Sequence, residues 1–192
     1  MARSALRELA AITQATGRDR MLIAAYRGGG AGMVDAADKT AALTDATRAL
    51  TTIAAPHALI GGVAVGVHSG VPRATADTDI AIASGVERAT VTRALIAAGF
   101  RLTGEFAHSM NFRHPTGEPV QIVFDAAFDA MIDRAERLDL GSVSVPIVTK
   151  PDLITMKERA ASDPARRRSK ALQDRADAEL LRGDVPDPDE GW

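Results

Sequence analysis

Apolar residues recur along much of this chain at the three- and four-residue spacing that is typical of an amphipathic helix. The spacing predicts helices over residues 4–26, 39–54, 63–68, 86–98, 151–162 and 165–182. Two helix ends carry further signals. Gly99 follows the fourth helix where a glycine commonly caps the C-terminus, and Asp163-Pro164 separates the last two helices.

Between the helices lie shorter apolar runs whose length suits strands. They cover residues 57–60, 80–83, 100–102, 107–112, 120–125 and 143–148, with a hairpin-type turn over 114–119. Interspersed helices and strands predict an α/β fold of the α+β type. We expect a small mixed β-sheet flanked by helices, with two further helices at the C-terminal end.

The segment between the first two strands concentrates polar residues that can carry chemistry. Gly61-Gly62 opens it, and Arg73, Thr75, Asp77 and Asp79 follow at two-residue spacing. Glycines let a ligand approach the backbone closely, and the N–H groups at the start of a helix favour phosphate. Because residues i and i+2 of a strand point to the same face, the two aspartates would stand side by side about 6–7 Å apart.

Two adjacent carboxylates repel each other unless a cation neutralises them. Mg²⁺ (or Mn²⁺) prefers oxygen ligands and is usually bound by one or two carboxylates together with substrate phosphates. Two such ions about 3.5–4 Å apart can activate an attacking oxygen and stabilise the leaving one. A third carboxylate would complete that site, and Asp125 is the candidate because it ends the apolar run 120–124. We therefore expect Asp77, Asp79 and Asp125 to be metal ligands and catalytic residues.

The glycine pair, the run Arg73-x-Thr75-x-Asp77-x-Asp79 and the later Asp125 resemble the motifs of the minimal nucleotidyltransferase superfamily. The run 148–157 and the pattern Arg168-Ser169-Lys170…Asp174-x-x-Asp177…Leu180 are similar to its bacterial AbiEii-like branch, which includes abortive-infection and toxin–antitoxin members. The resemblance covers roughly residues 50–182.

The resemblance implies the nucleotidyltransferase fold, a metal site at the three aspartates and a glycine turn, Gly61 and Gly62, that holds the nucleotide phosphates. Many members of the family have Ser or Thr directly after or within the glycine pair, and its hydroxyl contacts phosphate. Val63 stands there in this chain, which leaves only backbone donors.

Three further residues belong to the predicted nucleotide site. Arg73 can pair with phosphate through its planar guanidinium, although a salt bridge to Asp77 or Asp79 is the alternative. Thr75 stands between Arg73 and Asp77 and is assigned to the same site. Lys157 lies in the first turns of its helix and can reach a β- or γ-phosphate; the alternative is a solvated helix lysine.

The C-terminal helix carries two more groups of charged residues. Lys170, Asp174 and Asp177 fall on one helix face at i, i+4 and i+7, where an internal ion pair is a sufficient explanation. The resemblance adds a possible site role for all three. Arg166-Arg167-Arg168, with Lys170, forms a cationic cluster that can bind an RNA backbone, and a solvated charged face is the alternative.

Composition narrows the class of protein. The chain has 192 residues, which suits one domain with a small appendage, and 46% of them are hydrophobic. It has no cysteine, which excludes disulfides and thiolate chemistry and is compatible with a reducing cytoplasm. The net charge of −2 gives no global signature of nucleic-acid binding, and no stretch approaches the length of a membrane span. We expect a cytoplasmic protein.

The expected organisation has three parts. Residues 1–50 form an N-terminal helical segment with a Gly-rich linker, residues 51–182 form the nucleotidyltransferase domain, and residues 183–192 form a disordered acidic tail. The expected function is Mg²⁺-dependent transfer of a nucleoside monophosphate from an NTP to a hydroxyl, on a tRNA 3′ end, a protein or a small molecule of the aminoglycoside type. A role in a toxin–antitoxin pair, with an antitoxin partner, is implied by the resemblance. The alternative is a catalytically inactive module of the same fold that binds nucleotide or a partner.

Overall fold

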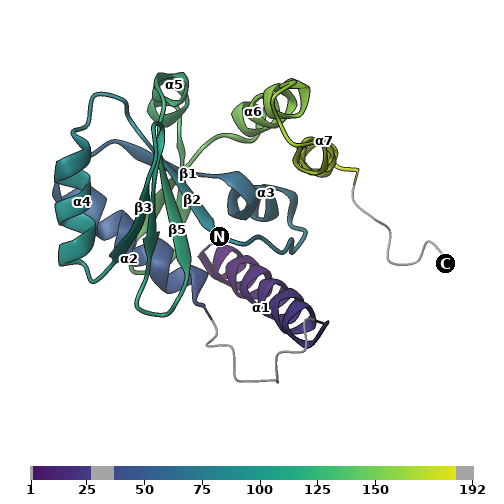
Figure 1. The fold of residues 1–192 in the computed structure, drawn as a ribbon, viewed down its shortest axis with the longest axis horizontal. Coiled ribbons are helices and arrows are strands. Elements are labelled where there is room, and N and C mark those ends of the chain that lie inside the picture. The colour runs from purple at the N-terminus through teal and green to yellow at the C-terminus, as the bar shows by residue number, and fades with distance from the viewer. Residues whose placement is uncertain (1, 27–36, 185–192) are drawn as a thin grey trace.

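The computed structural model describes residues 2–26 and 37–184, and a mixed seven-stranded β-sheet forms the centre of this part of the chain (Figure 1). The strand order is β3-β4-β5-β2-β1-β7-β6. The strands are β1 (His57–Ile60), β2 (Thr78–Ile82), β3 (Arg101–Glu105), β4 (Ser109–Arg113), β5 (Pro119–Phe124), β6 (Glu136–Asp139) and β7 (Ser144–Ile147).

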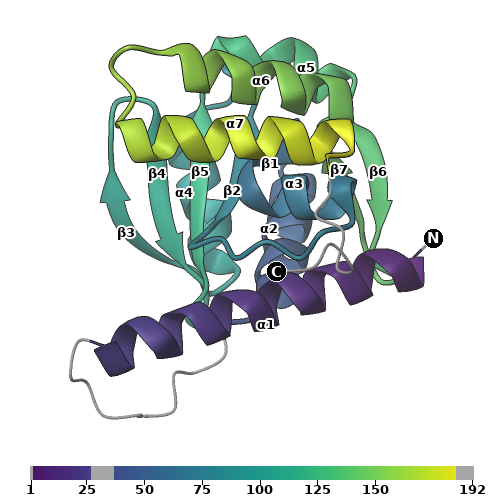
Figure 2. The ribbon, with the colours of Figure 1, turned by 90° about the vertical axis from the view of Figure 1, so that its right-hand side faces the viewer.

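Helices lie on both faces of the sheet. They are α1 (Ala2–Tyr26), α2 (Lys39–Thr52), α3 (Gly61–Ser69), α4 (Arg88–Ala97), α5 (Asp129–Asp133), α6 (Lys150–Ser162) and α7 (Arg168–Arg182), with a 3₁₀ turn η1 (Ala126–Phe128). Helices α2 and α4 cover one face, whereas α3, α6 and α7 lie on the other (Figure 1). The long helix α1 runs across one end of the sheet (Figure 2). No described helix has the length and apolar character that crossing a bilayer requires.

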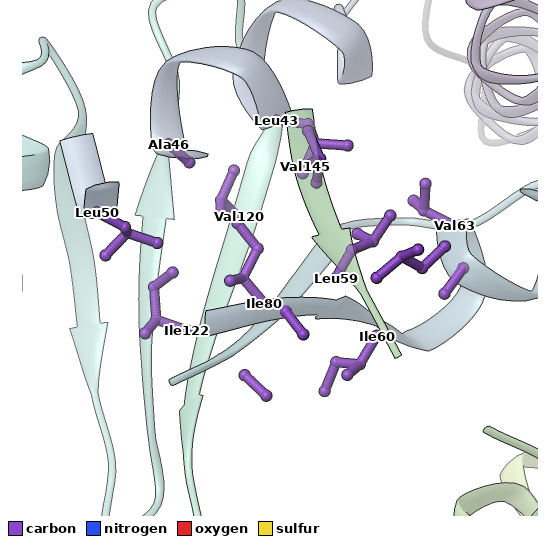
Figure 3. Packing of buried hydrophobic residues seen from close by; sticks show 14 of the residues in the cluster. Leu43, Ala46, Leu50, Leu59, Ile60, Val63, Ile80, Val120, Ile122 and Val145 are labelled. Atoms are coloured by element: carbon purple, nitrogen blue, oxygen red, sulfur yellow. The ribbon is translucent and has the colours of Figure 1, made fainter. Parts of the chain in front are cut away.

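The hydrophobic core follows the alternation of the strands. Buried residues of β2 and β5, among them Ile80, Val120 and Ile122, pack against the α2 side chains Leu43 and Leu50 (Figure 3). This packing leaves the intervening residues of the same strands on the opposite face, because successive strand side chains alternate between faces. The residues of chemical interest lie on that opposite face.

Strand pairing fixes the position of the candidate site. β2 is antiparallel to β1 and parallel to β5, and β4 is antiparallel to β5. Asp79 pairs in register with Ile60 on one side and with Gln121 on the other. Asp79 therefore lies at the end of β1 from which α3 departs.

The sequence predicted most of these elements within a few residues of their ends. It missed β6, α5 and η1, which are short and carry weak periodicity, and it placed the start of α3 two residues late. Leu9 of α1 and Leu43 of α2 belong to the same buried cluster as the sheet residues. The Gly-rich stretch 27–32 lies outside the described residues, and so do residues 185–192 of the acidic tail.

Candidate active site

The glycine turn connects β1 directly to α3. Gly61 has φ +71°, a left-handed conformation that favours glycine, and it opens the helix. A Cβ at Gly61 would collide with the Asp79 carboxylate, and a Cβ at Gly62 would collide with the Arg73 guanidinium and lie 2.6 Å from Thr75 Oγ1. The turn therefore brings the backbone into close contact with three of the predicted site residues.

The start of α3 has the properties of an anion-binding site. Its N-cap residue is Ile60, which makes no side-chain hydrogen bond to the helix. The first N–H groups of a helix have no partner within it, and the helix dipole favours negative charge at this end. Val63 is buried and has no hydroxyl, so the polar groups at this turn are backbone N–H groups, with Arg73 and Thr75 beside them.

Asp79 is a predicted metal ligand whose pKa is strongly raised. Burial, and then the charge of Asp77, raise the pKa of Asp79 to about 7. Lys157 and Lys39 act in the opposite direction and lower it. A bound cation stabilises a carboxylate that is buried beside a second negative charge. Asp77, Asp79 and the phosphates of a nucleotide therefore form a donor set that fits Mg²⁺ or Mn²⁺.

A buried ion pair supports the aspartate segment from the α2 side of the sheet. Lys39 donates a hydrogen bond to Glu118, and both side chains are at most 1% exposed. Thr78 donates to the same Glu118 carboxylate at 3.0 Å, and Lys39 also lies 3.4 Å from the Asp77 carbonyl. The α2 pair, Lys39 and Glu118, therefore fixes the backbone on which Asp77 and Asp79 stand.

Helix α1 holds the loop that precedes the aspartates. Thr16 Oγ1 accepts a hydrogen bond from the Thr75 amide at 3.2 Å and lies 3.3 Å from the Thr75 carbonyl. Arg20 donates to the Ala76 carbonyl at 2.7 Å. These contacts tie residues 75 and 76 to α1 and so restrict the position of Thr75 beside the glycine turn.

A second buried ionic cluster lies on the opposite side of the site, where α6 meets α7. Arg73 Nε pairs with Asp177 at 2.6 Å, and Lys157 Nζ lies 2.9 Å from Asp174 and 2.8 Å from Asp177. Arg166 pairs with Asp174 at 2.7 Å. We call these five residues the α6–α7 network.

The network brings together Arg73, Lys157, Asp174 and Asp177, all of which the sequence had selected. The ion pairs that these residues form differ from the ones that the sequence suggested. Arg73 pairs with Asp177 rather than with Asp77 or Asp79, and Lys157 is buried rather than solvated. Lys170 is exposed and contacts Gln173 at 3.4 Å, so the ion pair expected within α7 is replaced by pairs from α7 to α6 and to Arg73.

Asp125 does not join the other two aspartates, which corrects the three-carboxylate cluster expected from the sequence. In the parallel β2–β5 pair the residue in register with Asp79 is Gln121. Asp125 follows four residues later, roughly 13 Å along the strand. There its exposed carboxylate accepts the Ala127 amide at 2.9 Å and caps η1. Across residues 2–26 and 37–184 no three His, Cys, Asp or Glu side chains are grouped to hold a metal ion.

The basic cluster at the start of α7 is divided. Arg166 belongs to the α6–α7 network through Asp174, although its side chain is 41% exposed. Arg167 is the N-cap residue of α7 and Arg168 is its first residue, and both are exposed. The surface that can meet an RNA backbone is therefore narrower than the four-residue cluster predicted from the sequence.

Sequence reasoning missed Lys39, Glu118 and Gln121. Lys39 gave no signal, because a lysine at the start of a helix is usually solvated. Gln121 did give one: it is a polar residue between the apolar Val120 and Ile122. That pattern places Gln121 on the strand face opposite the core, but it does not give the register of β5 with Asp79.

Known structures support the fold. The chain is similar to an antigenic nucleotidyltransferase-like protein from Paracoccidioides brasiliensis, with 22% identity, 74% of each chain covered and a TM-score of 0.51. It is also similar to the antibiotic-resistance factor ANT(2″)-Ia, with 17% identity, 76% of this chain and 85% of that chain covered and a TM-score of 0.54. That protein is also known in complex with adenylyl-2″-tobramycin.

A third similar structure is the lincosamide antibiotic adenylyltransferase LnuA with bound lincomycin, at 16% identity, 71% of this chain and 91% of that chain covered and a TM-score of 0.50. No protein-family model matches the chain, and no curated protein matches it. These likenesses show that the chain has the nucleotidyltransferase fold. They do not single out the AbiEii-like branch.

Proposed function

We propose that this protein is a divalent-metal-dependent nucleotidyltransferase, which moves a nucleoside monophosphate from an NTP to a hydroxyl acceptor and releases pyrophosphate. One observation carries the proposal: the glycine turn at the start of α3 is in van der Waals range of Asp79, Arg73 and Thr75 together. The backbone N–H groups that we propose to hold phosphate and the Asp79 carboxylate that we propose to hold a cation therefore lie close together. The nucleotidyltransferase fold of the similar structures agrees with this assignment.

Each residue has a defined task in the proposed reaction. The backbone N–H groups of Gly61 and Gly62 would hold the triphosphate, and Arg73 and Thr75 would contact it from the side. Asp77 and Asp79 would hold Mg²⁺, which when bound neutralises phosphate charge. Lys157 and the rest of the α6–α7 network would add positive potential near the leaving group.

The transfer itself needs no covalent enzyme intermediate. The acceptor oxygen attacks the α-phosphorus, and the bond from that phosphorus to the oxygen that bridges to the β-phosphate breaks. Pyrophosphate leaves with that oxygen and its electron pair, and the hydroxyl proton passes to water. The protein contributes position and electrostatics, which dominate catalysis of phosphoryl transfer in general.

The acceptor is the part of the function that the fold leaves open. ANT(2″)-Ia and LnuA are structures with antibiotic ligands, which favours a small-molecule hydroxyl. The resemblance to AbiEii-like proteins favours an RNA or protein acceptor and a toxin–antitoxin role with an antitoxin partner. Each acceptor class gives a different labelled product, so one assay separates them.

The test is incubation with each α-³²P-labelled NTP and Mg²⁺ in the presence of total RNA, cell protein or aminoglycoside and lincosamide antibiotics. We expect the parent protein to label one acceptor class, and D77N and D79N to lose the labelling. D125N is the matched control, because Asn keeps the cap of η1 and the residue lies at the far end of β5. Labelling that persists in D79N would refute the assignment.

A second candidate function is nucleotide binding without turnover. Gln121, a neutral amide in register with Asp79, occupies the position where a third carboxylate would stand. Under this hypothesis the parent binds NTP in a Mg²⁺-dependent manner and labels no acceptor. D79N would still lose the binding, which distinguishes this outcome from the absence of a nucleotide site.

A further inference from the structure

Three polar side chains stand in a row across the sheet face that carries Asp79. Asp79 of β2 is in register with Gln121 of β5, and Gln121 is in register with Asn111 of β4. Side chains in register on neighbouring strands share a face and lie about 5 Å apart. The row therefore contains one carboxylate and two neutral amides. Gln121 is the β5 residue placed beside Asp79.

Gln121 is oriented by its neighbour in this row. Its amide nitrogen lies 3.3 Å from Asn111 Oδ1 and donates a hydrogen bond to it. This contact leaves the amide oxygen of Gln121 as the end that can face a ligand. An amide oxygen accepts hydrogen bonds but carries no net charge and takes no proton at neutral pH, unlike a carboxylate.

The other nearby carboxylates cannot substitute for a third acidic ligand. Glu118 lies on the α2 side of the sheet and is committed to Lys39 and Thr78. Asp174 and Asp177 are paired with Lys157, Arg166 and Arg73. Asp125 lies at the other end of β5 and caps η1.

Two divalent cations about 3.5–4 Å apart repel each other, so such a pair is stable only where enough anionic ligands surround it. We propose that this site, on the basis of the function proposed above, binds a single divalent cation together with the nucleotide. The Gln121 amide sets this number. It replaces the anionic ligand that a second cation would need, and its oxygen is left to accept a hydrogen bond from the acceptor hydroxyl.

Counting bound cations tests the proposal without relying on turnover. The probe is Mn²⁺ with α,β-methylene-ATP, which cannot be cleaved between its first two phosphates, and free Mn²⁺ is measured by electron paramagnetic resonance. We expect one Mn²⁺ per bound nucleotide in the parent and in Q121L. Q121E supplies the missing carboxylate beside Asp79, so we expect two Mn²⁺ per bound nucleotide in that variant.

Thermal unfolding of the same variants gives a second reading. Q121E places a further negative charge beside two repelling carboxylates, so without metal its Tm should fall below that of the parent. Saturating Mn²⁺ and the analogue should then raise the Tm of Q121E more than that of Q121L. Equal Mn²⁺-dependent shifts in Q121E and Q121L would overturn the role given to Gln121.

The remaining outcomes separate this inference from the proposed function. Two Mn²⁺ per nucleotide in the parent would overturn the single-cation site and leave nucleotidyl transfer standing. A single Mn²⁺ in Q121E would overturn the role of Gln121 in setting the number. Binding of Mn²⁺ and analogue that is as tight in D79N as in the parent would overturn the proposed function, and this inference with it.

Discussion

Two ionic clusters lie on opposite sides of the segment that carries Asp77 and Asp79, and they differ in how far they are open to solvent. The α2 pair joins Lys39 to Glu118, with both side chains at most 1% exposed, and Arg20 lies 4.0 Å from the same glutamate. The α6–α7 network joins three cations to two carboxylates, and the side chains of Arg73, Lys157 and Arg166 are 15%, 10% and 41% exposed. Lys39 of the first cluster and Lys157 of the second both lower the pKa of Asp79.

The difference separates a structural role from a role in ligand binding. The α2 pair is closed off from solvent and lies on the α2 side of the sheet, so its effect is to fix the backbone around it. The α6–α7 network includes Arg73, whose guanidinium lies beside Gly62, so an anion bound at the glycine turn would interact with the network directly. The α6–α7 network lies beside the glycine turn, where we propose that the triphosphate binds. Ligand should therefore affect the second cluster and leave the first unchanged.

The largest effect is expected from breaking the α2 pair. E118Q leaves the Lys39 ammonium buried without its counter-charge, which typically costs about 3–5 kcal/mol in the free energy of unfolding. Lys39 is 1% exposed, so water cannot replace the lost counter-charge. Burial already lowers the pKa of Lys39, and the loss of Glu118, which raises it, would lower it further. Urea unfolding with and without the nucleotide analogue and Mn²⁺ checks the prediction, and the loss should be similar in both conditions.

The double variant K39M/E118L serves as the control for that experiment. Replacement of both ions by apolar side chains of similar size removes the unpaired charge, so most of the stability should return. If the double variant is as unstable as E118Q, the damage comes from lost packing or from the hydrogen bond of Thr78 to Glu118 rather than from a buried charge.

A smaller and ligand-sensitive effect is expected in the network. D177N removes the carboxylate shared by Arg73 and Lys157, while Asp174 still pairs with Lys157. We expect a loss of about 1–3 kcal/mol without nucleotide, the usual range for a buried group that loses a charged partner. Saturating nucleotide should reduce that loss, because phosphate replaces the missing negative charge. A loss that is the same with and without nucleotide would place the network outside the nucleotide site.

Asp79 lies between the clusters, and its titration gives the next prediction. Its pKa in the metal-free folded protein is about 7, above the 3.8 of a free carboxyl group, so the folded state binds more protons across this interval. The free energy of unfolding therefore contains a contribution from Asp79 that is present below about pH 4 and is lost as the pH rises through 7.

The amide side chain that D79N introduces cannot ionise, so its burial does not become unfavourable as the pH rises. We expect D79N to be more stable than the parent at pH 8 by on the order of 1 kcal/mol, after allowance for partial solvent screening, and equally stable near pH 4. Thermal unfolding at the two pH values in EDTA measures the difference. Mg²⁺ with the nucleotide analogue should raise the Tm of the parent and leave that of D79N unchanged. A parent that is more stable than D79N at pH 8 without metal would contradict the pKa.

Local patterns predicted the fold and the Asp77–Asp79 end of the site, because both depend on periodicity and on residues close in sequence. Gly61, Gly62, Arg73, Thr75 and the two aspartates span one connection, so their meeting could be expected from short-range geometry. The sequence selected Arg73, Lys157, Asp174 and Asp177 of the α6–α7 network as candidates. It did not predict the ion pairs that join them, since Arg73 and Asp177 are far apart in the chain.

Asp125 shows why the rest could not be read from the sequence. The end of an apolar run was a reasonable place for a third carboxylate. Which β5 residue lies beside Asp79, however, depends on the β2–β5 register. That register is set by packing of Val120 and Ile122 against α2, which no local pattern reports. The same argument explains why Gln121, four residues earlier, was missed. A shift of the β5 register by one residue would have placed the Gln121 side chain on the core face of the sheet.

The smallest effect is expected at the surface of α7, where the two exposed arginines can be separated from the network. R167A/R168A leaves the pair of Arg166 with Asp174 in place, so the free energy of unfolding and the affinity for the nucleotide analogue should not change. If the acceptor is RNA, each lost phosphate contact should flatten the dependence of log affinity on log salt by about 0.7–0.9. R166A is the matched comparison, because it should lose RNA affinity and also destabilise the network around Asp174. RNA binding by R167A/R168A with the salt slope of the parent would exclude these arginines from RNA binding and favour a small-molecule or protein acceptor.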